Sequence, residues 1–334
     1  MNLKSKILEF LKGDKTYGFD ELALAIFQRQ ARENAMYREF LDLMAIKVEQ
    51  VHEISDIPLF PIRLFKKYAV KTGDWQAQMI FQSSGTSDMT ERSGHYVRDP
   101  EFYRDVCQQI FSSYYADPEI EIIALLPSYI ENGQSSLVAM VRHLAKFYNQ
   151  NPEDIFYLYD YTSLMARIKE VLNTTGKQVI LFGVSFALLD FAESFSLEDE
   201  RLRILFTGGM KNRRKEMIYE ELYDRLKTSF PLSSIDSEYG MTEMFSQSYS
   251  IDDRQGWFKT GRTLKIFGKE LYDPLSDVKI GKTAQLGFID LANLDTLSFI
   301  LTDDLVIKDK KDRFKILGRI HKSDLRGCNL MYQS

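Results

Sequence analysis

The sequence predicts an α/β fold, and two observations support this prediction. Between residues 100 and 226, short apolar runs alternate with stretches in which apolar residues recur at helical spacing. That alternation is typical of βαβ units around a parallel sheet. After about residue 251 the apolar segments are short and interrupted by glycine, as in WFKTGRTLKIF and GFIDLANL. A smaller β-rich subdomain is therefore expected to follow the parallel-sheet core.

Helical periodicity dominates the first 50 residues. Apolar residues such as Leu22, Ile26 and Leu41 recur at three- and four-residue steps, and no proline interrupts them. The two prolines of IPLFP, within residues 56–61, are expected to stop regular structure. Residues 77–82 then predict a strand. Residues 1–75 are therefore expected to form an N-terminal helical region.

The core elements follow in order. Pro100 suits the first turn of a helix, where its missing N–H is not needed, and the continuous apolar run EIIALL is typical of a buried parallel strand. Helices are expected at residues 100–115, 135–148, 164–173, 186–195 and 216–226. Strands are expected at residues 121–126, 154–158, 178–182 and 203–207. Ligands of such sheets bind at the carboxyl ends of the strands, so a site is expected in the loops there.

Composition limits the classes of function. Of the 334 residues, 44% are apolar and 27% are charged, as in a globular protein with a sizeable core. The formal charge of −5 and the lack of a basic block argue against nucleic acid as a partner. No apolar stretch suits a signal peptide or an integral membrane segment, which favours a cytoplasmic protein. The two cysteines and four histidines show no disulfide framework or metal-ligand spacing.

The stretch FQSSGTSDMTERSGH, residues 81–95, is the first candidate for a site. Its hydroxyls and glycine could turn side-chain and backbone donors toward one anion, as a phosphate-binding loop does. The flanking residues predict a loop between two strands, and no lysine follows the glycine as it does in the common phosphate loop. The alternative is an ordinary polar turn. The candidate residues are Ser83, Ser84, Gly85, Thr86 and Ser87.

A second candidate is TGGMKNRR, residues 207–214. Gly208 and Gly209 would allow a flat ligand to approach the backbone, and the cations that follow could meet negative charge. Those cations are Lys211, Arg213 and Arg214. The alternative is a simple turn before a solvated helix.

The segment SEYGMTEMF, residues 237–245, is more specific. Tyr239 offers an aromatic plane, Gly240 a turn, Thr242 a hydroxyl and Glu243 a carboxylate that could hold Mg²⁺. The alternative places Tyr239 and Met241 in the core and Glu243 on the surface.

The last candidates lie near the C-terminus. Asp303 and Asp304 stand at a strand boundary, where a carboxylate could accept both hydroxyls of a ribose, although aspartate pairs also mark simple turns. Arg319 follows in the next segment. Cys328 is close to His321, Lys322 and Arg326, which would favour its thiolate, although free cysteines are often inert core residues.

In their order and spacing, SSGTS, TGG, EYGMTE, TDDL and GR resemble the motifs of the adenylate-forming synthetases, the superfamily of acyl-CoA ligases and luciferases. Within it the chain most resembles acyl-protein synthetases of the LuxE type. The segments IPLFPIRLFKKY, LLPSYIENGQSSLVAMV and RGCNLM carry that resemblance, which spans nearly the whole chain.

The resemblance implies a role for each motif. The serines and threonine of SSGTS would bind the phosphates of ATP, Gly208 and Gly209 would line the adenine pocket, and Tyr239 would stack on the base. Thr242 would contact the α-phosphate and Glu243 the Mg²⁺. Asp303 or Asp304, with Arg319, would hold the ribose. Lys211, Arg213 or Arg214 could supply the charge that relatives take from a loop lysine, and His321 replaces the hinge acid of relatives.

The resemblance also implies the domain organisation. The chain would be a single adenylating domain that corresponds to the large N-terminal domain of the superfamily, without the mobile C-terminal domain of CoA ligases. The expected parts are residues 1–75 (helical), 76–250 (nucleotide- and acyl-binding core), 251–318 (β-rich) and 319–334 (tail with the candidate carrier Cys328).

The implied function is ATP- and Mg²⁺-dependent activation of a carboxylic acid, a fatty acid by resemblance. The acyl group would pass from the adenylate to Cys328 as a thioester and then to an acceptor protein, such as an acyl reductase or a carrier protein. Two alternatives stay open: a ligase that makes acyl- or aryl-CoA, and a nucleotide-binding relative without catalysis.

Overall fold

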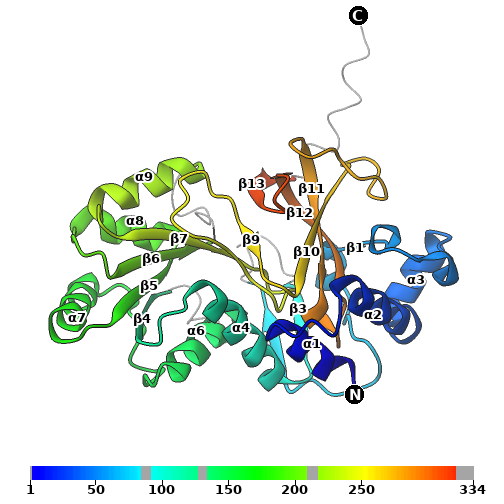
Figure 1. Ribbon diagram of the computed structural model, residues 1–334, viewed down its shortest axis with the longest axis horizontal. Helices are drawn as coiled ribbons and strands as arrows, with labels where there is room; N and C mark the ends of the chain where they lie inside the picture. The colour runs from blue at the N-terminus through cyan, green and yellow to red at the C-terminus, as the bar shows by residue number, and fades with distance from the viewer. Residues whose placement is uncertain (1, 84–91, 127–133, 209–216, 321–334) are drawn as a thin grey trace, which may run out of the picture.

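The computed structural model describes residues 2–83, 92–126, 134–208 and 217–320. Within these ranges two large β-sheets lie next to each other, together with a two-stranded sheet, and helices pack around them (Figure 1). No described helix is long and apolar enough to span a bilayer.

The first sheet has six strands in the order β4-β5-β6-β7-β8-β9. The first four are parallel and the last two antiparallel: β4 (Ile120–Leu125), β5 (Gln178–Val184), β6 (Leu202–Thr207), β7 (Ser234–Tyr239), β8 (Ser248–Ser250) and β9 (Lys259–Thr260). Its helices are α4 (Pro100–Tyr114), α6 (Ser136–Phe147), α7 (Tyr161–Thr174), α8 (Ser185–Ser194) and α9 (Tyr219–Ser229). Helices α8 and α9 cover one face, and α4 and α6 the other (Figure 1). The predicted α/β core is thus confirmed.

Local sequence explains where these helices begin. The Asp99 side chain accepts hydrogen bonds from the backbone N–H groups of Glu101 and Phe102, and Pro100 occupies the first turn. Ser135 caps α6 in the same way. Every residue of β4 is buried, as its continuous apolar run predicts.

The second sheet has five strands and forms the β-rich part. Its members are β1 (Phe60–Pro61), β10 (Leu264–Lys269), β11 (Thr283–Asp290), β12 (Phe299–Lys308) and β13 (Phe314–Arg319). Strand β12 lies in the middle, between β1, β11 and β13. The N-terminal helices α1 (Leu3–Leu11), α2 (Phe19–Glu33) and α3 (Ala35–Leu43) lie on the same side of the molecule (Figure 1). Phe27 and Tyr37 pack against Phe299, with ring centroids 5.9 and 5.8 Å away.

A hairpin connects the two halves of the molecule. Strands β2 (Met79–Gln82) and β3 (Gly94–Val97) are antiparallel, with Phe81 opposite His95. The hydroxyl-rich segment therefore connects two strands, as predicted. Short 3-10 helices complete the description: η1 (Val48–Gln50), η2 (Ile54–Asp56), η3 (Ile62–Lys66) and η4 (Leu291–Asn293).

Two sequence predictions were wrong in detail. Residues 154–158 do not form a strand, because only Phe156 bridges Ala124 of β4. The Gln150 side chain occupies the next position along that edge, where it bonds both the N–H and the C=O of Ile122. The prolines at 58 and 61 also do not exclude a strand, since β1 pairs at the edge of the second sheet, where a missing N–H is tolerated.

Candidate active site

The described candidate residues lie on or next to several strands. They come from the ends of β2 and β6, from β7 and the turn after it, and from β12 and β13. They are Ser83, Gly208, Tyr239, Gly240, Thr242, Glu243, Asp303, Asp304 and Arg319. The other candidates lie outside the described residues: Ser84, Gly85, Thr86, Ser87, Gly209, Lys211, Arg213, Arg214 and Cys328.

Three of the described candidates form one contact group. The Tyr239 hydroxyl donates to Asp304 Oδ2 at 2.9 Å, and Arg319 Nε donates to Asp304 Oδ1 at 2.8 Å. Asp304 and Arg319 are opposite each other in β12 and β13, so strand register brings them together. Asp303 instead forms an ion pair with Arg63 at 2.8 Å. Asp304 is therefore the member of the aspartate pair that lies beside both Tyr239 and Arg319.

The Tyr239 side chain is buried rather than open to solvent. Its ring packs against the stacked rings of Phe258 and Phe314, with centroids 6.0 and 5.3 Å away. Burial raises the pKa of its phenol well above the ordinary range, and the neighbouring Asp304 charge acts in the same direction. The phenol is thus held as a neutral hydrogen-bond donor.

Glu243 is buried too, which excludes the surface alternative for this residue. Burial raises the pKa of its carboxyl, while a hydrogen bond from the Ser93 hydroxyl and the charges of Arg319 and Lys66 lower it. Ser93 also closes the base of the hydroxyl-rich loop, since its N–H donates to Ser83 Oγ at 3.0 Å and its carbonyl accepts from the Ser83 N–H at 3.1 Å. Ser93 therefore connects Ser83 with Glu243. A buried carboxylate beside hydroxyls suits Mg²⁺, which prefers oxygen ligands.

Buried side chains from other elements hold the backbone around Glu243. Asn293 Nδ2 donates to the Glu243 carbonyl at 2.7 Å. Asp290 accepts from the N–H groups of Phe245 and Ser246 at 3.0 and 2.9 Å, and from the Ser246 hydroxyl at 2.6 Å. These contacts fix the turn that carries Thr242 and Glu243.

One glycine follows each of the strands β6 and β7. Gly208 has φ +69°, a conformation that glycine adopts without strain, and its carbonyl accepts a hydrogen bond from the Ser185 hydroxyl at 2.5 Å. A side chain at Gly240 would place its Cβ 2.4 Å from Glu238 Oε1. Glu238 is bonded to the Thr207 hydroxyl, and burial raises its pKa to about 7. The missing side chain of Gly240 therefore leaves room for the buried Glu238 carboxyl group beside the backbone.

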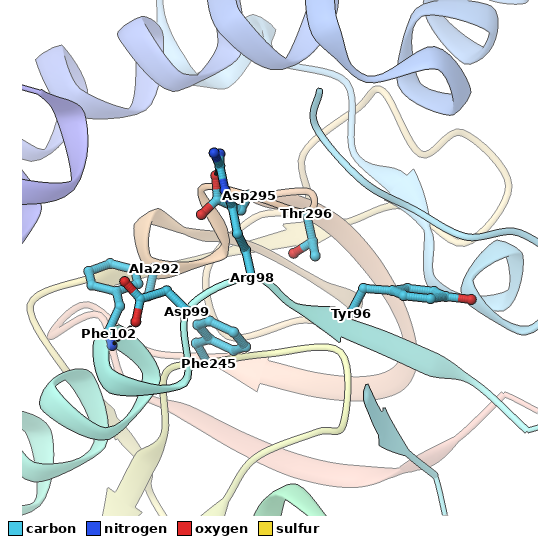
Figure 2. A pocket seen from close by; sticks show the side chains of 8 residues that line it. All are labelled: Tyr96, Arg98, Asp99, Phe102, Phe245, Ala292, Asp295 and Thr296. Atoms are coloured by element: carbon cyan, nitrogen blue, oxygen red, sulfur yellow. Dashed lines mark hydrogen bonds and ion pairs between the residues drawn. The ribbon is translucent and has the colours of Figure 1, made fainter. Parts of the chain in front are cut away.

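Figure 2 shows a small cavity lined by side chains that include Arg98, Asp295 and Thr296. Its volume of about 10 Å³ suits a single water and excludes a nucleotide. Arg98 points to Asp295, with 3.4 Å between Nη1 and Oδ1. None of the candidate site residues lines this cavity.

Of the two cysteines, only Cys107 lies in the described part. It is buried, and burial raises the pKa of its thiol to about 12. Cys107 therefore has none of the thiolate character that a nucleophile requires.

Sequence reasoning missed four residues that the structure brings to the site, namely Ser93, His95, Asp290 and Asn293. The local sequence around these residues gives no signal, because each side chain forms a hydrogen bond with a backbone or carboxyl group that is far away in sequence. Ser93 and His95 lie within the candidate stretch of residues 81–95, but no role was assigned to either of them.

No protein-family profile matches the chain. It is 22% identical to a long-chain-fatty-acid–luciferin-component ligase from Vibrio harveyi, over 92% of this chain and 85% of that protein. Among solved structures, 2-hydroxyisobutyryl-CoA ligase in its postadenylation state aligns with a TM-score of 0.64 and 13% identity, over 90% of this chain and 68% of that chain. O-succinylbenzoate coenzyme A synthetase from Bacillus subtilis, in complex with AMP, aligns with a TM-score of 0.52 and 15% identity, over 73% of this chain and 49% of that chain. The predicted resemblance is therefore confirmed: the chain has the fold of the adenylate-forming ligases and is similar to a LuxE-type fatty-acid ligase over most of its length.

Proposed function

We propose that this protein uses Mg·ATP to convert a carboxylic acid, by preference a fatty acid, into an acyl adenylate, and that Cys328 then receives the acyl group. The observation that carries the first step is the contact group of Tyr239, Asp304 and Arg319. Three motifs that are far apart in sequence, each expected to bind the nucleoside, meet through hydrogen bonds to one carboxylate.

In the first step a carboxylate oxygen of the acid attacks the α-phosphorus of ATP, and pyrophosphate leaves. Asp304 and Arg319 would hold the ribose, and Tyr239 would border the base. Thr242 would contact the α-phosphate and Ser83 would mark the start of the phosphate loop. Fixed donors and cations at these positions stabilise the charge that develops on phosphate.

Glu243 is the residue that would hold Mg²⁺. The ion would neutralise phosphate charge as a Lewis acid. The Glu243 carboxyl suits this role because it is buried beside the Ser93 hydroxyl, an oxygen group that could share the ion. The bond from Asn293 to its backbone carbonyl fixes its position.

In the second step the Cys328 thiolate would attack the acyl carbonyl, a thioester would form and AMP would leave. An acceptor protein, such as an acyl reductase or carrier protein, would then take the acyl group. The similarity to a ligase named for a long-chain fatty acid and a luciferin component supports the preference for fatty acids.

A second candidate is a ligase that transfers the acyl group to CoA. The alignment with 2-hydroxyisobutyryl-CoA ligase over 90% of this chain favours it. In that case Cys328 would have no part in the reaction, and a short or substituted acid would replace the fatty acid.

Intact-protein mass spectrometry after incubation with Mg·ATP and a panel of fatty and aromatic acids tests the proposal. We expect a hydroxylamine-labile acyl adduct that maps to the C-terminal peptide and is absent from Cys328→Ala, while pyrophosphate release persists in that variant. Cys107 is an internal control, since its buried thiol should stay unmodified. Pyrophosphate release without an adduct, together with acyl-CoA formation, would favour the second candidate. No pyrophosphate with any acid would contradict both.

A further inference from the structure

We propose that the Thr296 hydroxyl fixes the tautomer of His95, and that His95 in this tautomer holds the turn that carries Thr242. Both residues would act on the reaction through Thr242, and are therefore positioning residues. The catalytic part of the inference rests on the proposed function, in which Thr242 contacts the α-phosphate. The structural part rests on contacts within the chain alone.

The His95 side chain lies on β3 and is completely buried. Its ring stacks on Phe245, with centroids 4.7 Å apart, and forms an edge-on contact with Phe65 at 6.5 Å. This packing fixes the plane of the ring, so that Nδ1 faces the Thr242 carbonyl and Nε2 faces the Thr296 hydroxyl. Because Phe245 follows Thr242 by three residues, the ring packs on the same turn to which it is bonded.

The two partners of the ring select one tautomer. The Thr242 carbonyl, 2.8 Å from Nδ1, has no proton to give, so Nδ1 must carry one. The Thr296 hydroxyl lies 2.9 Å from Nε2, whereas its other acceptor, the Asn293 carbonyl, is 3.5 Å away. A doubly protonated ring would be a buried cation, and within the described part of the chain no carboxylate bonds to it. The ring is therefore neutral, and the Thr296 hydroxyl keeps the proton on Nδ1 by donating to Nε2.

The backbone of Thr296 is held independently of its hydroxyl. Its carbonyl accepts from Asn34 Nδ2 at 3.0 Å and from the Thr72 hydroxyl, and its N–H donates to the Asn293 carbonyl at 3.1 Å. These three partners are buried. Removal of the Thr296 hydroxyl alone should therefore leave the residue in place.

The Thr242 carbonyl is the point at which His95 holds the turn. Asn293 and Asp290 bond to the turn from the Glu243 carbonyl onward, so His95 adds an anchor one residue earlier. Without the bond from Nδ1 the Thr242 carbonyl would lose this donor, and the peptide between Thr242 and Glu243 could rotate. That rotation would displace the Thr242 hydroxyl from the α-phosphate.

Thr296→Val and Thr296→Ser test the inference in the full chain, because valine has nearly the shape of threonine without the hydroxyl and serine keeps the hydroxyl. Histidine-selective ¹⁵N NMR reports the tautomer, and the His95 signal is assigned by its absence from His95→Gln. We expect the Nδ1–H tautomer in the wild type and in Thr296→Ser, and its loss in Thr296→Val. Hydrogen exchange of the peptide that covers residues 242–246 should become faster in Thr296→Val alone. In that variant kcat for pyrophosphate release should fall about fivefold, as the loss of one hydrogen bond predicts, with KM for ATP unchanged.

His95→Asn and His95→Gln separate the two bonds of the ring, and they keep the inference testable if Thr296→Val does not fold. The asparagine amide can donate from near the position of Nδ1, whereas the longer glutamine amide reaches the position of Nε2. We expect slower hydrogen exchange of residues 242–246 and a higher kcat in His95→Asn than in His95→Gln. Equal values in the two variants would overturn the inference.

The Nδ1–H tautomer in Thr296→Val would also overturn it, and so would unchanged hydrogen exchange after this tautomer is lost. Pyrophosphate release separates the inference from the proposed function. No release by the wild type, with faster exchange in Thr296→Val, would support the positioning of the turn and contradict acid activation. Normal release by the wild type, with equal kcat in Thr296→Val and Thr296→Ser, would refute the role of Thr296 in positioning Thr242 and leave acid activation intact.

Discussion

The Nδ1 atom of His95 lies 2.8 Å from the carbonyl oxygen of Thr242. Because a carbonyl only accepts, Nδ1 carries the proton and Nε2 accepts from the Thr296 hydroxyl at 2.9 Å. The backbone carbonyl of Thr296 accepts in turn from Asn34 Nδ2 at 3.0 Å, at the junction of α2 and α3. A chain of buried hydrogen bonds thus connects the N-terminal helices with the turn that carries Thr242.

Replacement of His95 by glutamine should remove part of the acid sensitivity of the fold. Burial lowers the pKa of His95 from 6.5 to about 4. Below pH 6.5 His95 is therefore protonated in the unfolded chain, whereas in the folded chain it stays neutral until about pH 4. The contribution of the neutral His95 ring to the free energy of unfolding is complete above pH 6.5. It falls by about 3 kcal/mol as the pH drops through 4.

Urea unfolding of both proteins between pH 4 and 7.5 measures this effect. The free energy of unfolding of the wild type should decrease more steeply toward pH 4 than that of His95→Gln, so that the two curves converge. Parallel curves would show that His95 is not buried as a neutral ring.

Replacement of Glu238 by glutamine should change the free energy of unfolding with the opposite dependence on pH. Burial raises the pKa of Glu238 from 4.5 to about 7, so the folded chain holds a proton that the unfolded chain loses. The stability that this carboxyl contributes is complete below pH 4.5 and is lost as the pH rises through 7. Glu238→Gln should therefore gain up to about 3 kcal/mol relative to the wild type between pH 4.5 and pH 8.

Chemical unfolding at pH 4.5 and pH 8 checks this prediction, with the exposed Glu200→Gln as the control. The control should keep the same difference from the wild type at both pH values. The same result for Glu238→Gln would mean that folding does not raise the pKa of the Glu238 carboxyl.

The two aspartates of β12 should differ sharply in function. Asp304→Asn removes the charge that Arg319 and Tyr239 share, and should lower kcat/KM for ATP by at least about tenfold in a pyrophosphate-release assay. Asp303→Asn breaks only the partly exposed pair with Arg63, and should cost at most about 1 kcal/mol of stability. Comparable losses in kcat/KM for the two variants would contradict the assignment of Asp304.

The difference between Asp303 and Asp304 is an example of what the sequence alone does not predict. The run EIIALL predicted β4 because a strand buried on both faces needs apolar residues throughout. Nothing in TDDL distinguishes Asp303 from Asp304, because neighbouring residues of a strand point to opposite faces and only the pairing with β13 decides. In the same way, the Gln150 side chain forms hydrogen bonds with the edge of β4 where a strand was expected nearby. The pattern of apolar residues does not reveal such a side-chain contact.

Loss of the Asp290 carboxylate should damage both stability and the site. Asp290 is buried and accepts from the backbone N–H groups of Phe245, Ser246 and Ala292. In Asp290→Ala the Ser246 and Ala292 N–H groups lose this acceptor. Each unpaired buried donor costs about 1–3 kcal/mol, so we expect the two to lower the free energy of unfolding by at least about 2 kcal/mol.

Asp290→Asn is the informative partner variant, because its amide oxygen can accept from one side while its NH₂ group faces donors on the other. It should be less destabilised than Asp290→Ala, yet lower the rate of pyrophosphate release, since the turn before Phe245 carries Thr242 and Glu243. Chemical unfolding and pyrophosphate release measured on the same samples separate the two effects. Wild-type turnover in Asp290→Asn would show that the position of this turn does not depend on the carboxylate.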